Sequence, residues 1–116
     1  MAGVRLIQAD VIRRQLEAVF QKWGMAPEHI ATTVDAMVAT DLSGVDSHGL
    51  GMLPSYHERR GRGIINDRPN IRVVREKAAV GLIDADRSLG HPPSVMAMQL
   101  AAKKAKEVGV AVVGVR

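Results

Sequence analysis

The chain of 116 residues is long enough for one modest domain that buries about two-thirds of its unfolded surface. It has no cysteine, which excludes a disulfide framework and a thiolate nucleophile and leaves histidine and carboxylate side chains as metal ligands. The net charge of +4 favours anionic ligands without choosing between nucleic acid, phosphates and carboxylates. Met1–Gln8 lacks the apolar core of a secretory signal, and the apolar run Val108–Val115 is too short to span a bilayer. We therefore expect a cytoplasmic protein that does not enter the membrane.

Two amphipathic helices are predicted at the start of the chain. Over residues 10–23 apolar side chains recur at intervals of three and four, and Gly24 is suited to end this helix in the left-handed conformation. Pro27 favours the first turn of a second helix that runs to about Leu42. The short turn between them predicts antiparallel packing.

A third helix is predicted over about residues 49–60, with Ser47 as its N-cap. Pro54 conflicts with a continuous helix, because proline removes a backbone donor and clashes with the preceding turn. The helix must therefore begin near Leu53 or bend there.

After these helices the sequence pattern changes to that of an α/β layer. Residues 61–70 are rich in glycine and turn-forming residues, which places a domain boundary between residues 62 and 63. The second part is predicted to contain strands at 71–75, 78–83 and 110–115 and a helix at 94–108. That helix is expected to point Lys103, Lys104 and Lys106 outward.

The predicted fold is thus an α/β protein with a three-helix subdomain over 1–62 and the start of a mixed α/β domain over 63–116. The order strand, helix, strand predicts a right-handed βαβ unit. Residues 110–115 are apolar on both sides, as in strands of parallel sheets that are covered on both faces. We therefore expect the chain to be the N-terminal part of a longer protein or an obligate oligomer.

The segment Asp46–Gly49 brings an acid, a hydroxyl and an imidazole together between two predicted helices. Ser47 and His48 point about 100° apart if helical, which is poor geometry for a nucleophile and its base and disfavours a serine hydrolase. His48 is either a general acid/base, because imidazole titrates near neutrality, or a hydrogen-bonded structural histidine. Spacing alone favours the structural role. Tyr56 either offers its hydroxyl to a substrate or packs in the half-buried surface.

Other candidate sites are weaker. The combination of Asp41, Asp46 and His48 has no recognised metal-ligand spacing, so we predict no metal site. The glycine patterns lack the strand-to-helix context of a dinucleotide fingerprint. Six arginines over residues 59–75 could contact phosphates, but no aromatic residues interleave with them, which favours a solvated face or an oligomer contact over nucleic acid.

Asp41–Leu50 closely resembles a motif of the malate/L-lactate dehydrogenase family. That family is unrelated to the Rossmann-fold lactate and malate dehydrogenases and includes ureidoglycolate dehydrogenase, sulfolactate dehydrogenase and the Δ1-piperideine-2-carboxylate reductases. The resemblance covers nearly the whole chain. Beyond the paired helices and the motif, it includes Tyr56, the turn Gly63–Asn66, the loop Asp84–Gly90, and the Ala- and Lys-rich helix that leads into Gly109–Val113.

The resemblance implies hydride transfer between NAD or NADP and a 2-hydroxy acid, or its amino or imino analogue, in a non-Rossmann α/β fold. It also implies a homodimer with active sites near the subunit interface. His48 would donate or accept the proton of the reacting group, and Ser47 and Tyr56 would lie in or beside the substrate pocket.

Two departures from the family pattern matter. Met52 stands where many relatives carry an arginine that could bind the substrate carboxylate. The family's next motif, with a second active-site histidine and part of the cofactor site, should follow Arg116. We therefore expect the main NAD(P)-binding region beyond residue 116 and no activity of this chain alone. The alternatives are a small basic nucleic-acid-binding module and a non-catalytic dimerising fragment.

Overall fold

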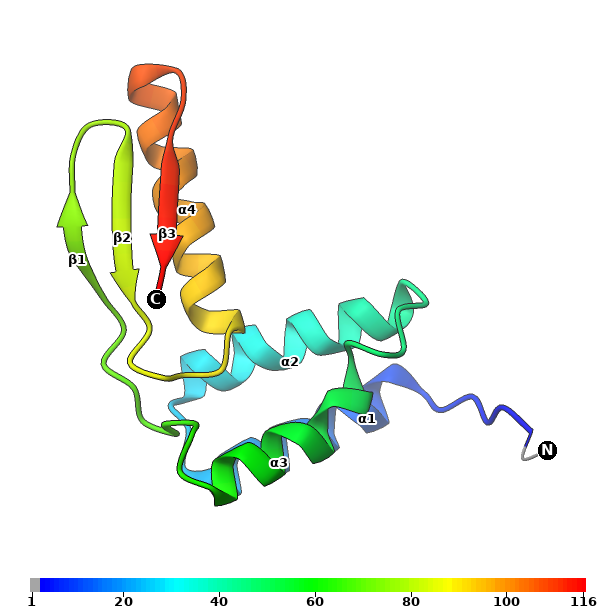
Figure 1. Cartoon of the computed structure of the whole chain (residues 1–116). Helices are drawn as coiled ribbons and strands as arrows, with labels where there is room; N and C mark the ends of the chain where they lie inside the picture. Colours follow the sequence, from blue (N-terminus) through cyan, green and yellow to red (C-terminus); the bar gives the residue numbers. More distant parts are fainter. Residues whose placement is uncertain (1–2) are drawn as a thin grey trace. The chain divides into compact units, whose positions relative to one another are not determined.

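The computed structural model describes residues 3–116, which form one compact unit that ends at His57 and a second unit, Glu58–Arg116 (Figure 1). The helices and strands are α1 (Ala9–Trp23), α2 (Pro27–Leu42), the 3₁₀ helix η1 (Leu50–Met52), α3 (Leu53–Gly61), β1 (Arg72–Glu76), β2 (Val80–Asp84), α4 (His91–Val108) and β3 (Val112–Val115). These elements confirm the predicted α/β class. The domain division between residues 62 and 63 stays a prediction.

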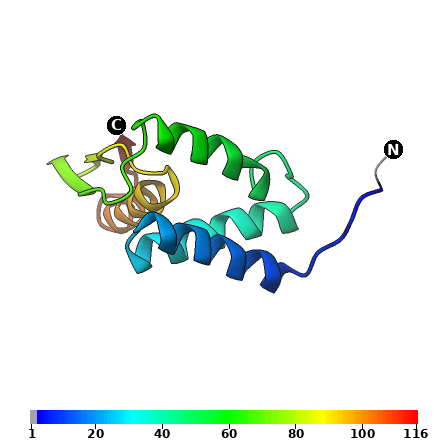
Figure 2. The same ribbon diagram turned by 90° about the horizontal axis from the view of Figure 1, so that it is seen from below.

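In the first unit, α1 and α2 form the predicted antiparallel pair (Figure 2). Gly24 ends α1 with a left-handed φ of 82°, as predicted. Its N–H donates to the carbonyl of Gln21, and the N–H of Met25 donates to the carbonyl of Phe20. This pair of bonds is the Schellman motif, which satisfies the last carbonyls of a helix and turns the chain toward the next one.

The core of the first unit is apolar. The buried apolar side chains of α1 and α2 are Leu16, Phe20, Trp23, Ile30, Val34, Met37 and Val38. The rings of Phe20 and Trp23 meet edge to face with their centroids 5.3 Å apart, a favoured aromatic arrangement. The helical spacing of these residues is what the sequence pattern predicted.

The prediction that Ser47 caps the third helix is wrong. The helical segment begins with η1, for which Gly49 occupies the cap position without a side-chain hydrogen bond, and the α-helix α3 begins at Leu53. Pro54 then falls in the first turn, where no backbone donor is lost. Ser47 lies six residues before Leu53, and its hydroxyl instead lies 2.7 Å from the Nδ1 atom of His48.

The second unit contains a three-stranded sheet in the order β1-β2-β3. β1 pairs antiparallel with β2, and β2 pairs parallel with β3, so β2, α4 and β3 form the predicted strand–helix–strand unit. α4 starts three residues earlier than predicted because Pro92 and Pro93 occupy its first turn, where their missing N–H groups cost nothing.

The two faces of this sheet differ in exposure. Ile83 is fully buried, and a side chain added at Gly81 would meet Leu100 of α4, so α4 covers this face (Figure 1). On the opposite face the paired residues Val80 and Val112 are 47% and 67% exposed. Within the second unit these valines therefore stay largely exposed. The longer protein or obligate oligomer expected from the apolar pattern stays a prediction.

The prediction that Lys104 faces solvent is wrong. The residue is only 7% exposed, and its ammonium donates to the carbonyl of Lys77 at 2.7 Å and lies 2.8 Å from a carboxylate oxygen of Glu76. Lys104 lies four residues after Leu100 and therefore on the face of α4 that packs on the sheet. Its stem is covered while its charge reaches the turn between β1 and β2.

We expect Lys104→Met to destabilise the protein by about 1–3 kcal/mol at neutral pH, because the carbonyl of Lys77 loses its donor while the apolar stem is kept. Urea unfolding measures this change. Lys103→Met is the matched control, since Lys103 is the exposed neighbour on the same helix and its replacement should change the free energy of unfolding by less than about 0.5 kcal/mol. Equal losses in the two variants would contradict a specific role for Lys104.

The Lys104 ammonium, first by its hydrogen bond and then by its charge, lowers the pKa of Glu76 below its ordinary value of 4.5. A carboxyl group with a lowered pKa in the folded state stabilises the fold above its unfolded pKa and loses this effect as the pH falls through the folded pKa. We therefore expect Glu76→Gln to flatten the pH dependence of the free energy of unfolding below pH 4.5. Urea unfolding across this range is the measurement. Glu107→Gln, which changes an exposed glutamate of α4, should leave the pH dependence as it is in the unaltered protein.

Candidate active site

The end of α2 sets the direction of the loop that carries the candidate residues. Gly44 has a left-handed φ of 78°, its N–H donates to the carbonyl of Asp41, and the N–H of Val45 donates to the carbonyl of Thr40. This is a second Schellman motif. The chain then turns again, because the N–H of His48 donates to the carbonyl of Val45 at 3.1 Å.

Ser47 and His48 are brought together within this loop. The Ser47 hydroxyl lies 2.7 Å from the Nδ1 atom of His48, and both side chains are exposed. A hydroxyl can donate to a neutral ring nitrogen or accept from a protonated one. The contact therefore accommodates either protonation state of Nδ1 and leaves Nε2 as the ring nitrogen for another group.

Asp41 ties the loop to α2. Its Oδ2 atom accepts a hydrogen bond from the backbone N–H of Leu50 at 2.8 Å. Gly49 is buried beneath the same carboxylate, and a Cβ atom built on Gly49 would overlap it. The space that the Asp41 carboxylate occupies therefore requires glycine at this position.

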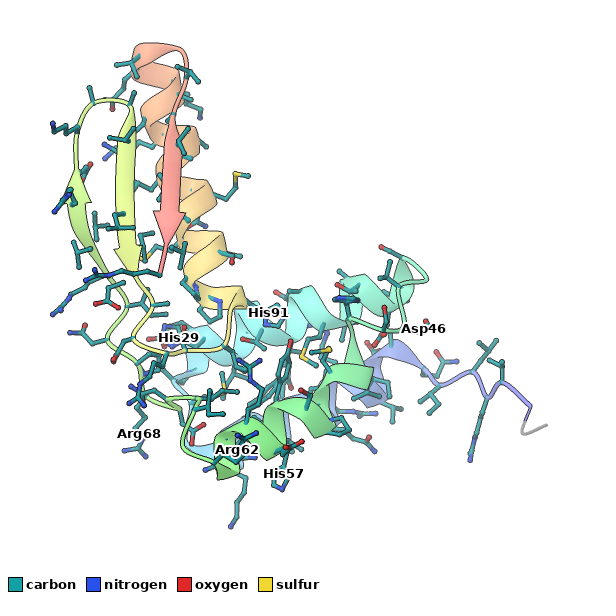
Figure 3. All side chains as sticks on the ribbon, viewed as in Figure 1. His29, Asp46, His57, Arg62, Arg68 and His91 are labelled. Atoms are coloured by element: carbon teal, nitrogen blue, oxygen red, sulfur yellow. The ribbon has the colours of Figure 1, made fainter. Side chains whose placement is uncertain are left out.

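A second glycine allows another close approach. A Cβ atom on Gly51 would lie 2.8 Å from the carbonyl oxygen of Asp46, which is closer than Cβ atoms approach other atoms in proteins. The carbonyl of Asp46 therefore packs on the backbone of η1, while its side chain is exposed in the loop after α2 (Figure 3). Gly49 and Gly51 therefore let the backbone of this short loop approach the Asp41 carboxylate and the Asp46 carbonyl closely.

Tyr56 lies on a different element from Ser47 and His48. It is a half-buried residue of α3, and by the rise of the helical segment it lies roughly 10 Å along the axis from Leu50. Met52, where the resemblance to the family leads us to expect arginine, is the last residue of η1 and half-buried. The assignment of Tyr56 to the substrate pocket stays a prediction.

The described residues give no support to a metal site or to an extended phosphate-binding surface. Among them, no group of three or more histidine, aspartate or glutamate side chains could hold a metal ion. Half of the arginine run is paired with carboxylates within the second unit: Arg60 with Asp67 at 2.7 Å, Arg62 with Glu58 at 3.7 Å, and Arg72 with Asp84 at 3.8 Å. Such pairing favours the predicted solvated face over a nucleic-acid site.

A pocket between α1 and α3 was not found by sequence reasoning. It measures about 590 Å³, and its lining residues are Ala18, Val19, Lys22, Trp23, Leu53, Pro54 and His57. The ring of His57, labelled in Figure 3, stacks on that of Trp23 with centroids 6.1 Å apart. Trp23 and His57 are 34 positions apart, and no sequence motif links residues at that separation. The periodicity of the two helices was the only sequence signal that could have pointed to this pocket. The lining does not include Ser47, His48 or Tyr56, so we do not assign the proposed chemistry to this pocket.

No helix in the described part of the chain has the length and apolar character needed to cross a membrane.

Comparison with known proteins gives a consistent result. Residues 7–116 match the family model described as malate/L-lactate dehydrogenase. The L-sulfolactate dehydrogenase of Methanocaldococcus jannaschii is 44% identical over 98 residues, which cover 84% of this chain and 28% of that protein. A malate dehydrogenase of Pyrococcus horikoshii is 40% identical over 95 residues, which cover 82% of this chain and 26% of that protein.

The fold agrees with the sequence match. The solved structure of the M. jannaschii sulfolactate dehydrogenase superposes with a TM-score of 0.92 at 38% identity over 97% of this chain and 33% of that chain. The chain thus spans between 26% and 33% of the length of these relatives. The resemblance seen in the sequence is confirmed, and the chain belongs to the malate/L-lactate dehydrogenase family.

Proposed function

We propose that the whole protein containing this chain transfers a hydride between NAD or NADP and a 2-hydroxy acid of the malate or lactate kind, with the 2-oxo acid as the other product. Family membership and the names of the relatives, which are sulfolactate and malate dehydrogenases, support this proposal. The observation that carries it is the hydrogen bond between Ser47 and His48 in an exposed loop. Two backbone turns and the carboxylate of Asp41 hold this loop in place.

His48 is the proposed proton-transfer group. Oxidation of a 2-hydroxy acid removes a proton from the hydroxyl oxygen as the hydride leaves the adjoining carbon, and reduction of the 2-oxo acid returns that proton. An imidazole can take the proton in one direction and give it back in the other. When bound, the nicotinamide cofactor accepts or supplies the hydride.

Ser47 suits both directions of the reaction. When the His48 ring is protonated, the Ser47 oxygen accepts a hydrogen bond from Nδ1, and when Nδ1 is bare, the hydroxyl donates to it. The ring can therefore change its protonation state without losing its partner. We also propose that the Ser47 hydroxyl and Tyr56 border the substrate.

The described residues do not fit the phosphates of a dinucleotide. The one strand-to-helix connection of the described second unit leads from β2 to α4, which begins with Pro92 and Pro93 near its N-terminus. A helix holds phosphate there through free N–H groups, which proline lacks. We therefore assign the cofactor, and the partner of the substrate carboxylate that Met52 does not supply, to other parts of the whole protein.

We further propose that the whole protein is a cytoplasmic homodimer and that this chain alone is inactive. The exposed apolar face with Val80 and Val112 offers a surface that needs to be covered by other residues or by a partner. We expect this chain alone to be inactive because we assign both the cofactor site and the partner of the substrate carboxylate to other parts of the whole protein.

In the whole protein, His48→Ala should lower kcat by about 10²- to 10⁴-fold, since a positioned acid/base contributes about this factor. The oxidation of a panel of 2-hydroxy acids and the reduction of 2-oxo acids, followed through the absorbance of the reduced cofactor, provide the measurement. His57→Gln changes an exposed histidine outside the loop and should keep kcat near that of the unaltered protein. If His48→Ala leaves kcat unchanged, the role proposed for His48 is wrong.

Ser47→Ala should lower kcat by about 2- to 12-fold, the kinetic equivalent of one hydrogen bond. Ser47→Thr keeps a hydroxyl and should retain most of the activity. The kcat and KM of the two variants, measured side by side, separate loss of the Nδ1 partner from loss of substrate binding. A fall in kcat of the same size in both variants would argue against the hydroxyl as the relevant group.

A further inference from the structure

We propose that Asp41 is a positioning residue for His48 and that it acts by holding the backbone of Leu50. This inference rests on the proposed function of His48. Asp41 lies in the last turn of α2, seven residues before His48, and its carboxylate bonds to the backbone N–H of Leu50 and not to the imidazole. Its influence on the reaction is therefore indirect and passes through the backbone of the loop.

The position of the Asp41 carboxylate supports this role. The carbonyl end of a helix carries partial negative charge, which disfavours an acidic side chain in the last turn. Asp41 occupies such a position at the end of α2 and is half-buried there. Stabilisation of α2 does not explain an aspartate at this site, whereas the hydrogen bond that Oδ2 accepts from Leu50 does.

Asp41 also packs closely against the backbone of Gly49. The carboxylate occupies the space that a side chain at Gly49 would need, and Gly49 is buried although residues 42–48 are exposed. The contact is therefore an extended one, in which one carboxylate both accepts a hydrogen bond and packs on the backbone. Hydrogen bonds to charged acceptors are stronger than those between neutral groups.

His48 lies between two backbone anchors of the loop. The Schellman motif at Gly44 holds the start of the loop, and Asp41 holds its end at Leu50, two residues after His48. An exposed imidazole has little packing of its own to orient it. These backbone anchors and the Ser47 hydroxyl are what define the position of the ring.

Ring position matters because proton transfer requires hydrogen-bond contact with the reacting oxygen, and a displacement of about 1 Å can reduce the rate by roughly 10²-fold. In the whole protein, Asp41→Ala should therefore lower kcat by about 10- to 100-fold while the KM for the cofactor changes little. Asp41→Asn keeps an oxygen that can accept from Leu50 and should restore kcat to within about 3-fold of the unaltered protein. Gly49→Ala displaces the same carboxylate from the other side and should resemble Asp41→Ala.

Two readouts do not depend on activity. The NMR signal of the His48 ring, identified by its loss in His48→Gln, should shift in Asp41→Ala and Gly49→Ala and stay in place in Asp41→Asn. Hydrogen exchange at the Leu50 amide should accelerate in the first two variants, because its acceptor is lost or displaced. The control is Asp46→Asn, which removes one exposed negative charge from the same loop and should change neither readout.

These measurements separate the two proposals. A normal kcat in Asp41→Ala with faster exchange at Leu50 would overturn the positioning role, as would a lowered kcat with an unmoved His48 signal. Failure of Asp41→Asn to restore kcat would mean that charge, and not the contact with Leu50, is what matters, and would overturn it too. If His48→Ala proves fully active, the role proposed for His48 fails. A His48 ring signal that shifts in Asp41→Ala and returns in Asp41→Asn would still support the positioning contact.

Discussion

The carboxylate of Asp41 accepts the backbone N–H of Leu50 and lies where Gly49 has no side chain. The loop between α2 and η1 depends on this contact, because it joins the end of one helix to the start of the next across eight intervening residues. His48 lies inside the closed loop and receives its partner from the adjacent Ser47. The arrangement fixes a polar, exposed group by means of the backbone, so no hydrophobic packing is needed around the imidazole.

The glycines of this region meet two different demands. Gly44 has a positive φ, which glycine adopts without the steric cost that a side chain would add. Gly49 makes room for the carboxylate of Asp41, and Gly51 makes room for the carbonyl of Asp46. The family motif therefore contains glycine both for backbone conformation and for close approach, which are separate physical requirements.

The second unit places a charge in a partly apolar setting. Lys104 lies on the face of α4 that packs on the sheet, and its ammonium is satisfied by the carbonyl of Lys77 and the carboxylate of Glu76 at the turn between β1 and β2. A buried charge is tolerated when it is paired and hydrogen-bonded in this way. The contacts of Lys104 connect α4 to the turn between β1 and β2. They add polar interactions to the apolar packing around Ile83.

Local chemistry in the sequence was sufficient for the element types and for most boundaries within three residues, whereas the family came from the resemblance of the sequence to known proteins. Gly24 and Pro27 act within one helical turn, so the end of α1 and the start of α2 could be predicted without knowledge of the fold. The sequence also singled out the loop with Ser47 and His48, although the resemblance to the family was needed to favour a catalytic role over a structural one. Only the tertiary structure decided the partners of Asp41 and Lys104, since these depend on how separate segments meet. The acceptor of Lys104 lies 27 residues away and that of the Leu50 amide nine residues away, distances at which periodicity carries no information about contact.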